Sequence, residues 1–345
     1  VFAGAIVMSI HSVLFAAVVG AVVGQENTVS VLQRRVSFQN GNPRDIFTSP
    51  SGTLRLIQTL ELQDAVSPRS QFEELSSFLL TSKGEEMLAT NDNGLFIRME
   101  LEPKFDDQFD VSKAFVYPMR DPQGDRLTDE DDLDTARGLA IDGTYGGGGR
   151  GELFVSYSEG RRMLKFPIGV DSRTSAEVDI SLVLDECRNA PQAIDIMRPD
   201  PLLPAYLTMV CDKPTRRCGS IYPAFAYDGD VPIRFEVESD DGFFPVDMAG
   251  LSDGSLMILF RGPNSRSGRR TMRIGLASSR DLSLAMRRRE GQVTPQIILE
   301  VAESDGFNIG RTSGLATREH DDRIFVYIVN DGSPITYLTT FEWIP

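Results

Sequence analysis

Histidine is scarce in this chain, and its scarcity excludes several catalytic mechanisms. The 345 residues include two histidines, His11 in an apolar N-terminal run and His320 in the turn REHDDR. A Ser-His-Asp site needs a histidine placed between a nucleophile and a carboxylate, and a single turn histidine is a poor basis for one. The HExxH and GxSxG motifs and the Arg-His-Gly signature of histidine acid phosphatases are also absent. Hydrolysis by this chain would therefore depend on carboxylates, arginines and a metal.

Basic charge is also in short supply. Lys and Arg total 35 against 50 Asp and Glu, a formal net charge of -15 at pH 7. Because nucleic acid is bound through a net basic surface, we expect no nucleic-acid partner. The acidity itself favours solubility.

Long apolar runs are absent after residue 24, whereas residues 1–24 are almost wholly apolar. Residues 12–24 have the length of a signal-peptide apolar region, with small residues near its end, but the whole run could just span a bilayer. We therefore predict a cleaved signal peptide, with a signal anchor as the alternative. A polar leader over 25–52 and a folded domain over 53–345 would follow. The protein would be secreted, or membrane-anchored if the segment is retained.

Cysteine is limited to Cys187, Cys211 and Cys218. The last two flank a Lys-Pro-Thr turn, which favours a Cys211–Cys218 disulfide in a secreted protein. Cys187 would then be free or would pair with another molecule, and three free thiols are the alternative. No CxxC pair or Cys/His cluster is present, so we do not expect a zinc site.

Helical periodicity is scarce, and short apolar strands bounded by Gly, Pro, Asp or Ser dominate instead. Five segments share one order: a small-residue strand, a polar turn, a stronger apolar strand, a polar corner and a third strand. Their starts lie about 54 to 67 residues apart, which is typical of repeat architectures. Room remains for a fourth strand over 109–118, 177–184, 233–239 and 294–301. The segments begin at Leu75, Ala136, Pro191, Pro245 and Thr312.

This order predicts an all-β protein, a β-propeller of five or six four-stranded blades, a fold that leaves only short edges exposed. The fifth segment ends the chain after three strands, while residues 53–63 form a strand without a partner. We expect that N-terminal strand to become the missing outer strand and to close the ring. A single large β-sandwich is the rival fold, but it would not explain the repeated order.

Charged residues occupy similar corners of the repeats. Asp92, Asp212 and Asp331 follow the second strand of their repeats, Glu159 lies near that corner in another, and Arg261 closes the strand SLMILFRG. Equivalent corners of a propeller converge on one face of its channel, so we expect these side chains to meet. Carboxylates that close need a cation, or some must stay protonated. Asn-Asp-Gly also suits a plain turn, which is the alternative for Asp92 and Asp331.

Residues 54–343 resemble a known family. The phrases ELSSFLLTSKGEEMLATNDNGLF, ARGLAIDGTYGGGGRGELFVSYSEGRRMLKFPI, FFPVDMAGLSDGSLMILFRG and TSGLATREHDDRIFVYIVNDG are similar, in order and spacing, to the phytase-like domain, described as esterase-like activity of phytase. The resemblance implies a propeller linked to phosphoester hydrolysis. It also implies that five residues match family positions: Asp92, Glu159, Asp247, Arg261 and Asp331.

The chain departs from the family pattern at four positions. Arg137 and Ser313 stand where the pattern has Glu before Gly-Leu, Gln192 replaces a Glu in the third repeat, and Ser77 replaces a Gly. If those glutamates bind metal or act as acid or base, the departures count against activity.

Two functions are therefore predicted. The first is a secreted, metal-dependent hydrolase of a small phosphorylated or ester substrate, using Ca²⁺. In it Asp92, Glu159 and Asp331 would be catalytic, Arg261 and Asp212 would contact the substrate, and Asp92, Asp247 and Asp331 would bind the metal. The alternative is a catalytically inactive extracellular propeller that binds a ligand or a protein partner.

Overall fold

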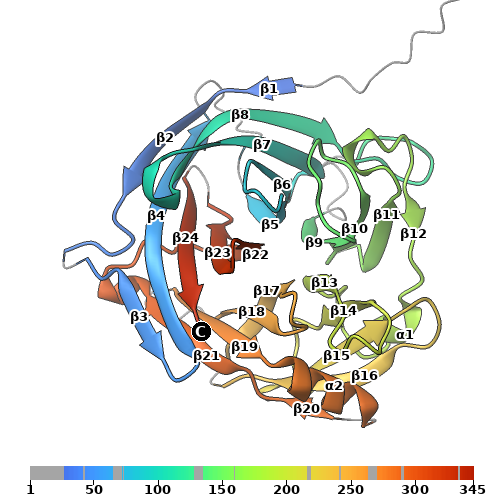
Figure 1. Cartoon of the computed structure of the whole chain (residues 1–345). Helices are drawn as coiled ribbons and strands as arrows, with labels where there is room; N and C mark the ends of the chain where they lie inside the picture. Colours follow the sequence, from blue (N-terminus) through green and yellow to red (C-terminus); the bar gives the residue numbers. More distant parts are fainter. Residues whose placement is uncertain are drawn as a thin grey trace, which may run out of the picture.

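The chain folds into a ring of five β-sheets, each forming one blade of a propeller (Figure 1). The computed structural model describes residues 27–41, 43–64, 72, 74–127, 135–158, 160–215, 219–240, 242–262, 270–288, 291–332 and 335–345. The predicted propeller is confirmed, with five blades rather than six. The predicted signal segment lies outside the described residues, and among those described no helix is long and apolar enough to cross a membrane.

The strands of each blade follow one another from the channel outward. Blade 1 contains β5 (Leu75–Leu80), β6 (Glu86–Asn91), β7 (Leu95–Pro103), β8 (Phe109–Pro118) and β1 (Asn27–Val29). Blade 2 contains β9 (Ala136–Asp142), β10 (Glu152–Tyr157), β11 (Arg162–Phe166) and β12 (Ala176–Glu177). Blade 3 contains β13 (Ala193–Met197), β14 (Tyr206–Val210), β15 (Ile221–Tyr227), β16 (Ile233–Glu238) and the parallel β20 (Gln292–Val293).

Blade 4 contains β17 (Phe244–Gly250), β18 (Leu256–Arg261), β19 (Thr271–Ala277) and β21 (Gln296–Ala302). Blade 5 contains β22 (Thr312–His320), β23 (Arg323–Asn330), β24 (Thr336–Ile344), β4 (Gly52–Asp64) and β2 (Val31–Val36), and β3 (Ile46–Ser49) also pairs with β4. The helical elements are α1 (Ser181–Leu184), α2 (Ser279–Arg287) and the short turns η1 (Phe105–Asp107), η2 (Gly169–Asp171) and η3 (Glu303–Asp305).

The N-terminal strand β4 closes the ring, as predicted. It pairs antiparallel with β24, from Leu62 opposite Thr336 to Thr53 opposite Ile344. The predicted polar leader over 25–52 contributes three strands to the ring. β2 and β3 pair with β4, and β1 pairs with β8, because the outer edges of blades 5 and 1 offer backbone groups to a further strand.

Two local predictions also need correction. The fourth strand of blade 2 was expected over 177–184, but β12 ends at Glu177 and α1 follows, its first backbone N–H bound by the Asp179 carboxylate at 3.0 Å. Helix α2 was not predicted. It begins after Ser278, whose hydroxyl accepts a hydrogen bond from the Asp281 backbone N–H at 3.1 Å, an ordinary N-terminal cap.

The apolar core fills the gaps between neighbouring blades. Phe96 and Tyr157 lie between blades 1 and 2, Phe260 between blades 3 and 4, and Phe341 between blades 4 and 5, all at 1% exposure or less. Because a blade has a neighbour on each side, its inner strands are buried on both faces. This explains the near-continuous apolar runs in the sequence.

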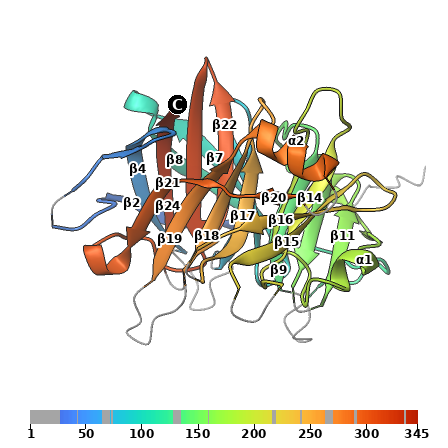
Figure 2. The same ribbon diagram turned by 90° about the horizontal axis from the view of Figure 1, so that it is seen from below.

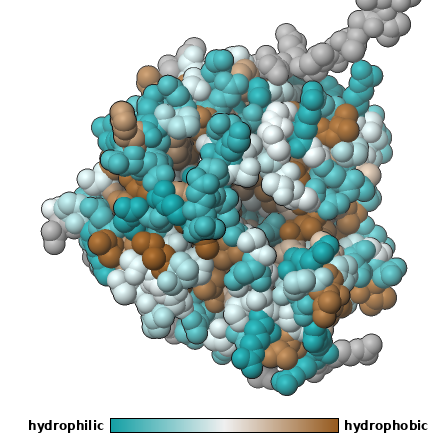
Figure 3. Space-filling view, in the orientation of Figure 1, coloured by the Kyte–Doolittle hydropathy of each residue, from teal (hydrophilic) through white to brown (hydrophobic). Residues whose placement is uncertain are grey.

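The two ends of the channel differ in what surrounds them. We call the end where the inner strands begin the lower face; it carries the corners at residues 92–94 and 331–332, and α1. The end where the inner strands finish is the upper face; it carries α2 (Figure 2). The upper face is hollowed at the centre of the ring (Figure 3).

Candidate functional site

Equivalent corners on the lower face are built in the same way in blades 1 and 5. The Asn91 side-chain oxygen accepts hydrogen bonds from two backbone N–H groups of the following turn, at 3.2 and 3.0 Å. The backbone N–H of Asp92 donates to the Glu74 carbonyl at 3.3 Å, and that of Asp331 donates to the Arg311 carbonyl at 2.9 Å. The side chain of the asparagine thus serves the turn, and the aspartate carboxylate makes other contacts.

Those carboxylates meet at an arginine. Arg137 Nη1 lies 2.8 Å from Asp92 Oδ2 and 3.6 Å from Asp331 Oδ2, and Arg311 Nη1 lies 3.0 Å from Asp331 Oδ2. The Asp331 side chain is 1% exposed, and those of Asp92 and Arg137 are each 15% exposed. The predicted meeting of Asp92 and Asp331 is confirmed, and the cation that it requires is a side chain of this protein.

Arg261 completes this group, which we call the corner network (Asp92, Arg137, Arg261, Arg311 and Asp331). Its guanidinium packs over the Phe244 ring, 4.9 Å from the centroid, and Nη1 donates to the Thr312 carbonyl at 3.4 Å. Burial, reinforced by the charge of Arg311, lowers the pKa of Arg261 to about 10. Three cations against two anions leave the network one positive charge in excess.

The pKa of Asp331 in the network is perturbed. Burial raises the pKa of Asp331 to about 6, against the opposing effects of Arg311 and Arg261. Although two arginines lie within ion-pair distance, neither carboxylate oxygen accepts a hydrogen bond from any described residue. The Asp331 carboxyl group therefore changes its protonation state just below neutral pH.

Asp247 has a different environment from the one that the sequence suggested. It is fully buried in β17, where Oδ2 accepts the Leu315 backbone N–H at 2.7 Å and Oδ1 accepts the Ser77 hydroxyl at 3.1 Å. Burial raises its pKa well above the ordinary value. Asp247 therefore ties blade 4 to blades 5 and 1.

The residues present do not fit the predicted calcium ion. Two of its expected ligands, Asp92 and Asp331, already share Arg137, and the third, Asp247, is occupied by hydrogen bonds in β17. Across the described part of the chain no group of three or more Asp, Glu, His or Cys side chains is arranged to hold a metal. Calcium binding stays a prediction without a matching ligand set.

Of the remaining predicted site residues, Asp212 does not join the network. Asp212 follows β14 on the lower face, where its Oδ2 lies 3.4 Å from both the Lys213 ammonium and the Asn189 amide. Glu159 lies outside the described residues. Arg311 was missed by the sequence reasoning, although it precedes the fifth repeat as Glu74 precedes the first, and that equivalence was available as a signal.

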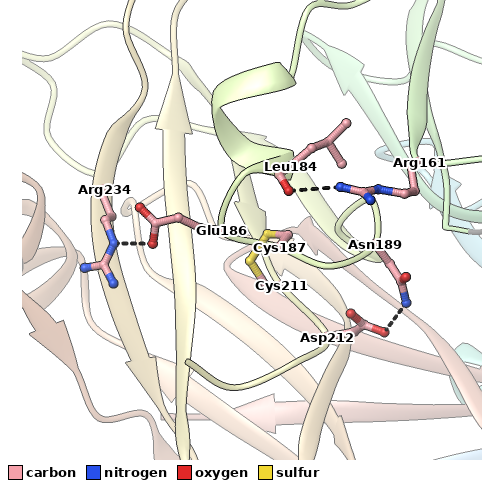
Figure 4. Close-up of a disulfide and its surroundings, with 8 residues drawn as sticks. All are labelled: Arg161, Leu184, Glu186, Cys187, Asn189, Cys211, Asp212 and Arg234. Atoms are coloured by element: carbon pink, nitrogen blue, oxygen red, sulfur yellow. Dashed lines mark hydrogen bonds and ion pairs between the residues drawn. A yellow bond between two sulfur atoms is a disulfide. The ribbon is translucent and has the colours of Figure 1, made fainter. Parts of the chain in front are cut away.

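The disulfide joins Cys187 to Cys211, with Cα atoms 5.4 Å apart, so the predicted Cys211–Cys218 bond is wrong (Figure 4). Cys187 lies in the segment that follows α1, Cys211 directly follows β14, and both are buried; Cys218 lies outside the described residues. The prediction relied on nearness in sequence. The ring instead packs the connection between blades 2 and 3 against the end of β14.

Comparison with known proteins adds little to this picture. No family model and no curated protein matches the chain. Solved structures that are similar include a chain of a mitotic checkpoint complex (9% identity, TM-score 0.40, covering 99% of this chain and 98% of that one). Two others are the Cps50 (Swd1) propeller domain of Myceliophteria thermophila (11%, 0.37, 91% and 99%) and the RRP9 WD40 repeats (8%, 0.39, 92% and 100%). Likeness at these scores carries no argument, and the five-bladed propeller is established by the strand pairing itself.

Proposed function

We propose that this chain is a binding propeller that does not hydrolyse phosphoesters, and that its corner network contacts an anionic group of a ligand or protein partner. The observation that carries the proposal is the placement of Arg137 between Asp92 and Asp331. In the predicted hydrolase these carboxylates would gather a metal or transfer protons. In this chain they neutralise an arginine instead.

The excess positive charge supports an anionic ligand. The guanidinium of Arg261 has five N–H donors, but among the described residues its one hydrogen bond is the 3.4 Å contact with Thr312. A carboxylate or phosphate accepts two such donors at once. A polar cleft of about 620 Å³, lined by Arg311 and Asp331 but not by Arg261, opens to solvent and gives an anion room beside Arg311.

Hydrolysis is the second candidate, and the raised pKa of Asp331 beside two arginines favours it, because an acid of that pKa can donate a proton near neutral pH. The two candidates are separated by assaying purified protein on inositol phosphates and a generic phosphoester, with and without Ca²⁺. We expect no turnover. Turnover that Asp92→Asn or Arg261→Ala removes would replace the binding proposal with the hydrolase.

Binding is tested with inorganic phosphate and citrate as probes, by calorimetry and thermal unfolding. We expect saturable binding that Arg261→Gln weakens at least tenfold, since a charge-assisted bidentate contact is lost. Arg150→Gln is the matched control, because that side chain is 78% exposed and pairs with Asp171 away from the network. Equal affinity of the Arg261 variant and the control for both anions would refute the proposed site.

A further inference from the structure

A cavity of about 430 Å³ opens on the upper face, at the opposite end of the channel from the corner network. Figure 3 looks onto it at the centre of the ring. Residues from all five inner strands line it, and Leu80, Ile141, Met197, Met248 and Ala316 are among them. Its size is that of a small-ligand site, and its open lining combines apolar side chains with a larger share of polar surface.

Two carboxylates lie within this lining, those of Asp195 and Glu319, and neither forms an ion pair with a described residue; Asp195 is the less exposed of the two. Asp195, in β13, accepts the Gly250 backbone N–H on Oδ2 at 2.6 Å and the Ile196 backbone N–H on Oδ1 at 2.8 Å. Each oxygen keeps capacity for a further hydrogen bond. Asp195 forms no ion pair with any described residue, and burial raises its pKa to about 6 with no cationic group acting against the shift. At pH 7.5 the carboxylate is still ionised.

The Gly250 backbone comes close to that carboxylate. A Cβ atom added at Gly250 would lie 3.1 Å from Asp195 Oδ2 and 3.5 Å from Met197 Cβ. The Gly250 backbone has an ordinary extended conformation, so its lack of a side chain is not required by a turn. The glycine lets its N–H approach Asp195 Oδ2 without a Cβ atom crowding that oxygen.

The other charged residues of the lining do not compensate Asp195. The Arg318 guanidinium stacks on Phe325, 4.0 Å from the ring centroid, and its Nε donates to the Tyr327 hydroxyl at 3.0 Å. Glu319 accepts hydrogen bonds from the backbone N–H and the hydroxyl of Ser252, and Arg198 is exposed at the rim. The charge of Asp195 itself raises the pKa of a second buried carboxylate, that of Asp247, after the larger effect of burial.

We propose that the upper-face cavity binds a cationic group, an ammonium or guanidinium on an apolar stem, with Asp195 as its counter-ion. The apolar side chains of the lining would hold the stem, as the methylenes of lysine and arginine are held on protein surfaces. The carboxylate would accept a charge-assisted hydrogen bond from the head. A lysine or arginine side chain of a partner protein and a free alkylamine share this chemistry, and the experiment distinguishes them.

The test compares n-pentylammonium with n-pentanol, which has the same stem without the charge, by calorimetry at pH 7.5. We expect the amine to bind at least tenfold more tightly than the alcohol. Asp195→Asn should abolish this preference, because the amide keeps an acceptor for the Gly250 N–H but loses the charge. The matched control is Asp253→Asn, an exposed acid of the same face that serves its own turn and does not line the cavity.

A second variant protects the test against misfolding of the first. Gly250→Ala leaves every charge in place and adds a Cβ atom 3.1 Å from Asp195 Oδ2, which crowds the oxygen that would contact the cation, so it should weaken amine binding at least tenfold. Titration with the peptides acetyl-Gly-Lys-Gly-amide and acetyl-Gly-norleucine-Gly-amide then shows whether a peptide-borne lysine enters. Tighter binding of the lysine peptide than of free amine indicates a protein partner, and the reverse indicates a small amine.

Equal binding of amine and alcohol, or a preference that survives Asp195→Asn, would overturn the proposal. Because the anion tests address the other face, either proposal can fail alone.

Discussion

Replacement of Arg137 by glutamine should destabilise the protein by removing the cation shared by two carboxylates. A unit charge pair at the 2.8 Å Asp92–Arg137 separation corresponds to a gross attraction of about 6 kcal/mol at an effective dielectric constant of about 20. Desolvation offsets much of it, and losing one partner of a buried pair costs about 3–5 kcal/mol. Both side chains here are 15% exposed and Asp331 keeps Arg311, so we expect about 2–3 kcal/mol for Arg137→Gln.

The loss should depend on pH, and its sign follows from Asp331. The pKa of Asp331 is about 6 in the folded protein, above its ordinary value of 3.8. A carboxyl with a raised folded pKa favours folding while it is protonated, and that contribution is lost as the pH rises through about 6. Without Arg137 the ionised form is still less favourable. The cost of Arg137→Gln should therefore be larger at pH 7.5 than at pH 5.

The measurement is urea unfolding at both pH values, followed by the fluorescence of the single tryptophan, Trp343, and by far-ultraviolet circular dichroism. Coincident transitions would justify a two-state free energy. Arg150→Gln, which removes an exposed ion pair, should cost less than about 0.5 kcal/mol. A cost for Arg137→Gln below about 0.5 kcal/mol, or one equal at both pH values, would refute the account of the corner network.

Three further outcomes test other parts of the structure. Cys187→Ser removes a disulfide that spans 24 residues and should lower the free energy of unfolding by about 3.5 kcal/mol through loop entropy. A reducing agent should lower the urea midpoint of the parent but not that of the variant. Equal sensitivity of both proteins to the reducing agent would contradict the assigned disulfide. Asp247→Ala leaves two buried hydrogen-bond donors without an acceptor and should lower the free energy of unfolding in urea by about 3 kcal/mol, whether Ca²⁺ or a chelator is present. A loss that depends on Ca²⁺ would instead support Asp247 as a calcium ligand. Arg137→Glu changes the net charge of the corner network from one positive to one negative charge. Added Ca²⁺ should therefore raise the thermal unfolding midpoint of this variant and not that of the parent. Identical responses of the two proteins would count against the assigned role of Arg137.

The β-architecture could be predicted from the order of residues. Apolar runs of strand length, each followed by a polar corner, recur because every blade must bury both faces against its neighbours and turn at each end. The N-terminal strand without a partner predicted closure of the ring, because a fifth blade of three strands would leave a strand edge exposed. Helix α2 was not predicted because it is a single short insertion between β19 and β20, outside the repeated order of strands.

The site was only partly predictable. Repetition placed Asp92 and Asp331 at equivalent corners, and in a closed ring equivalent corners face one axis, so their meeting followed from the sequence. Arg137 was visible as a departure from a family pattern, but nothing in its neighbours along the chain showed which carboxylates it would contact. Asp247 was assigned to the same site because it matches a position of the family pattern. Its position within β17, rather than at a corner, placed it in the interior, where hydrogen bonds satisfy it.

The sequence by itself therefore determined the strands, their grouping into blades and the corners at which charges gather, because these depend on local alternation of apolar and polar residues. Only the tertiary structure decided which charges neutralise one another, which cysteines are bonded, and that Asp195 lies in a cavity without a cation. Those outcomes depend on distances of a few ångströms between residues far apart in the chain, which follow from how the blades pack around the channel.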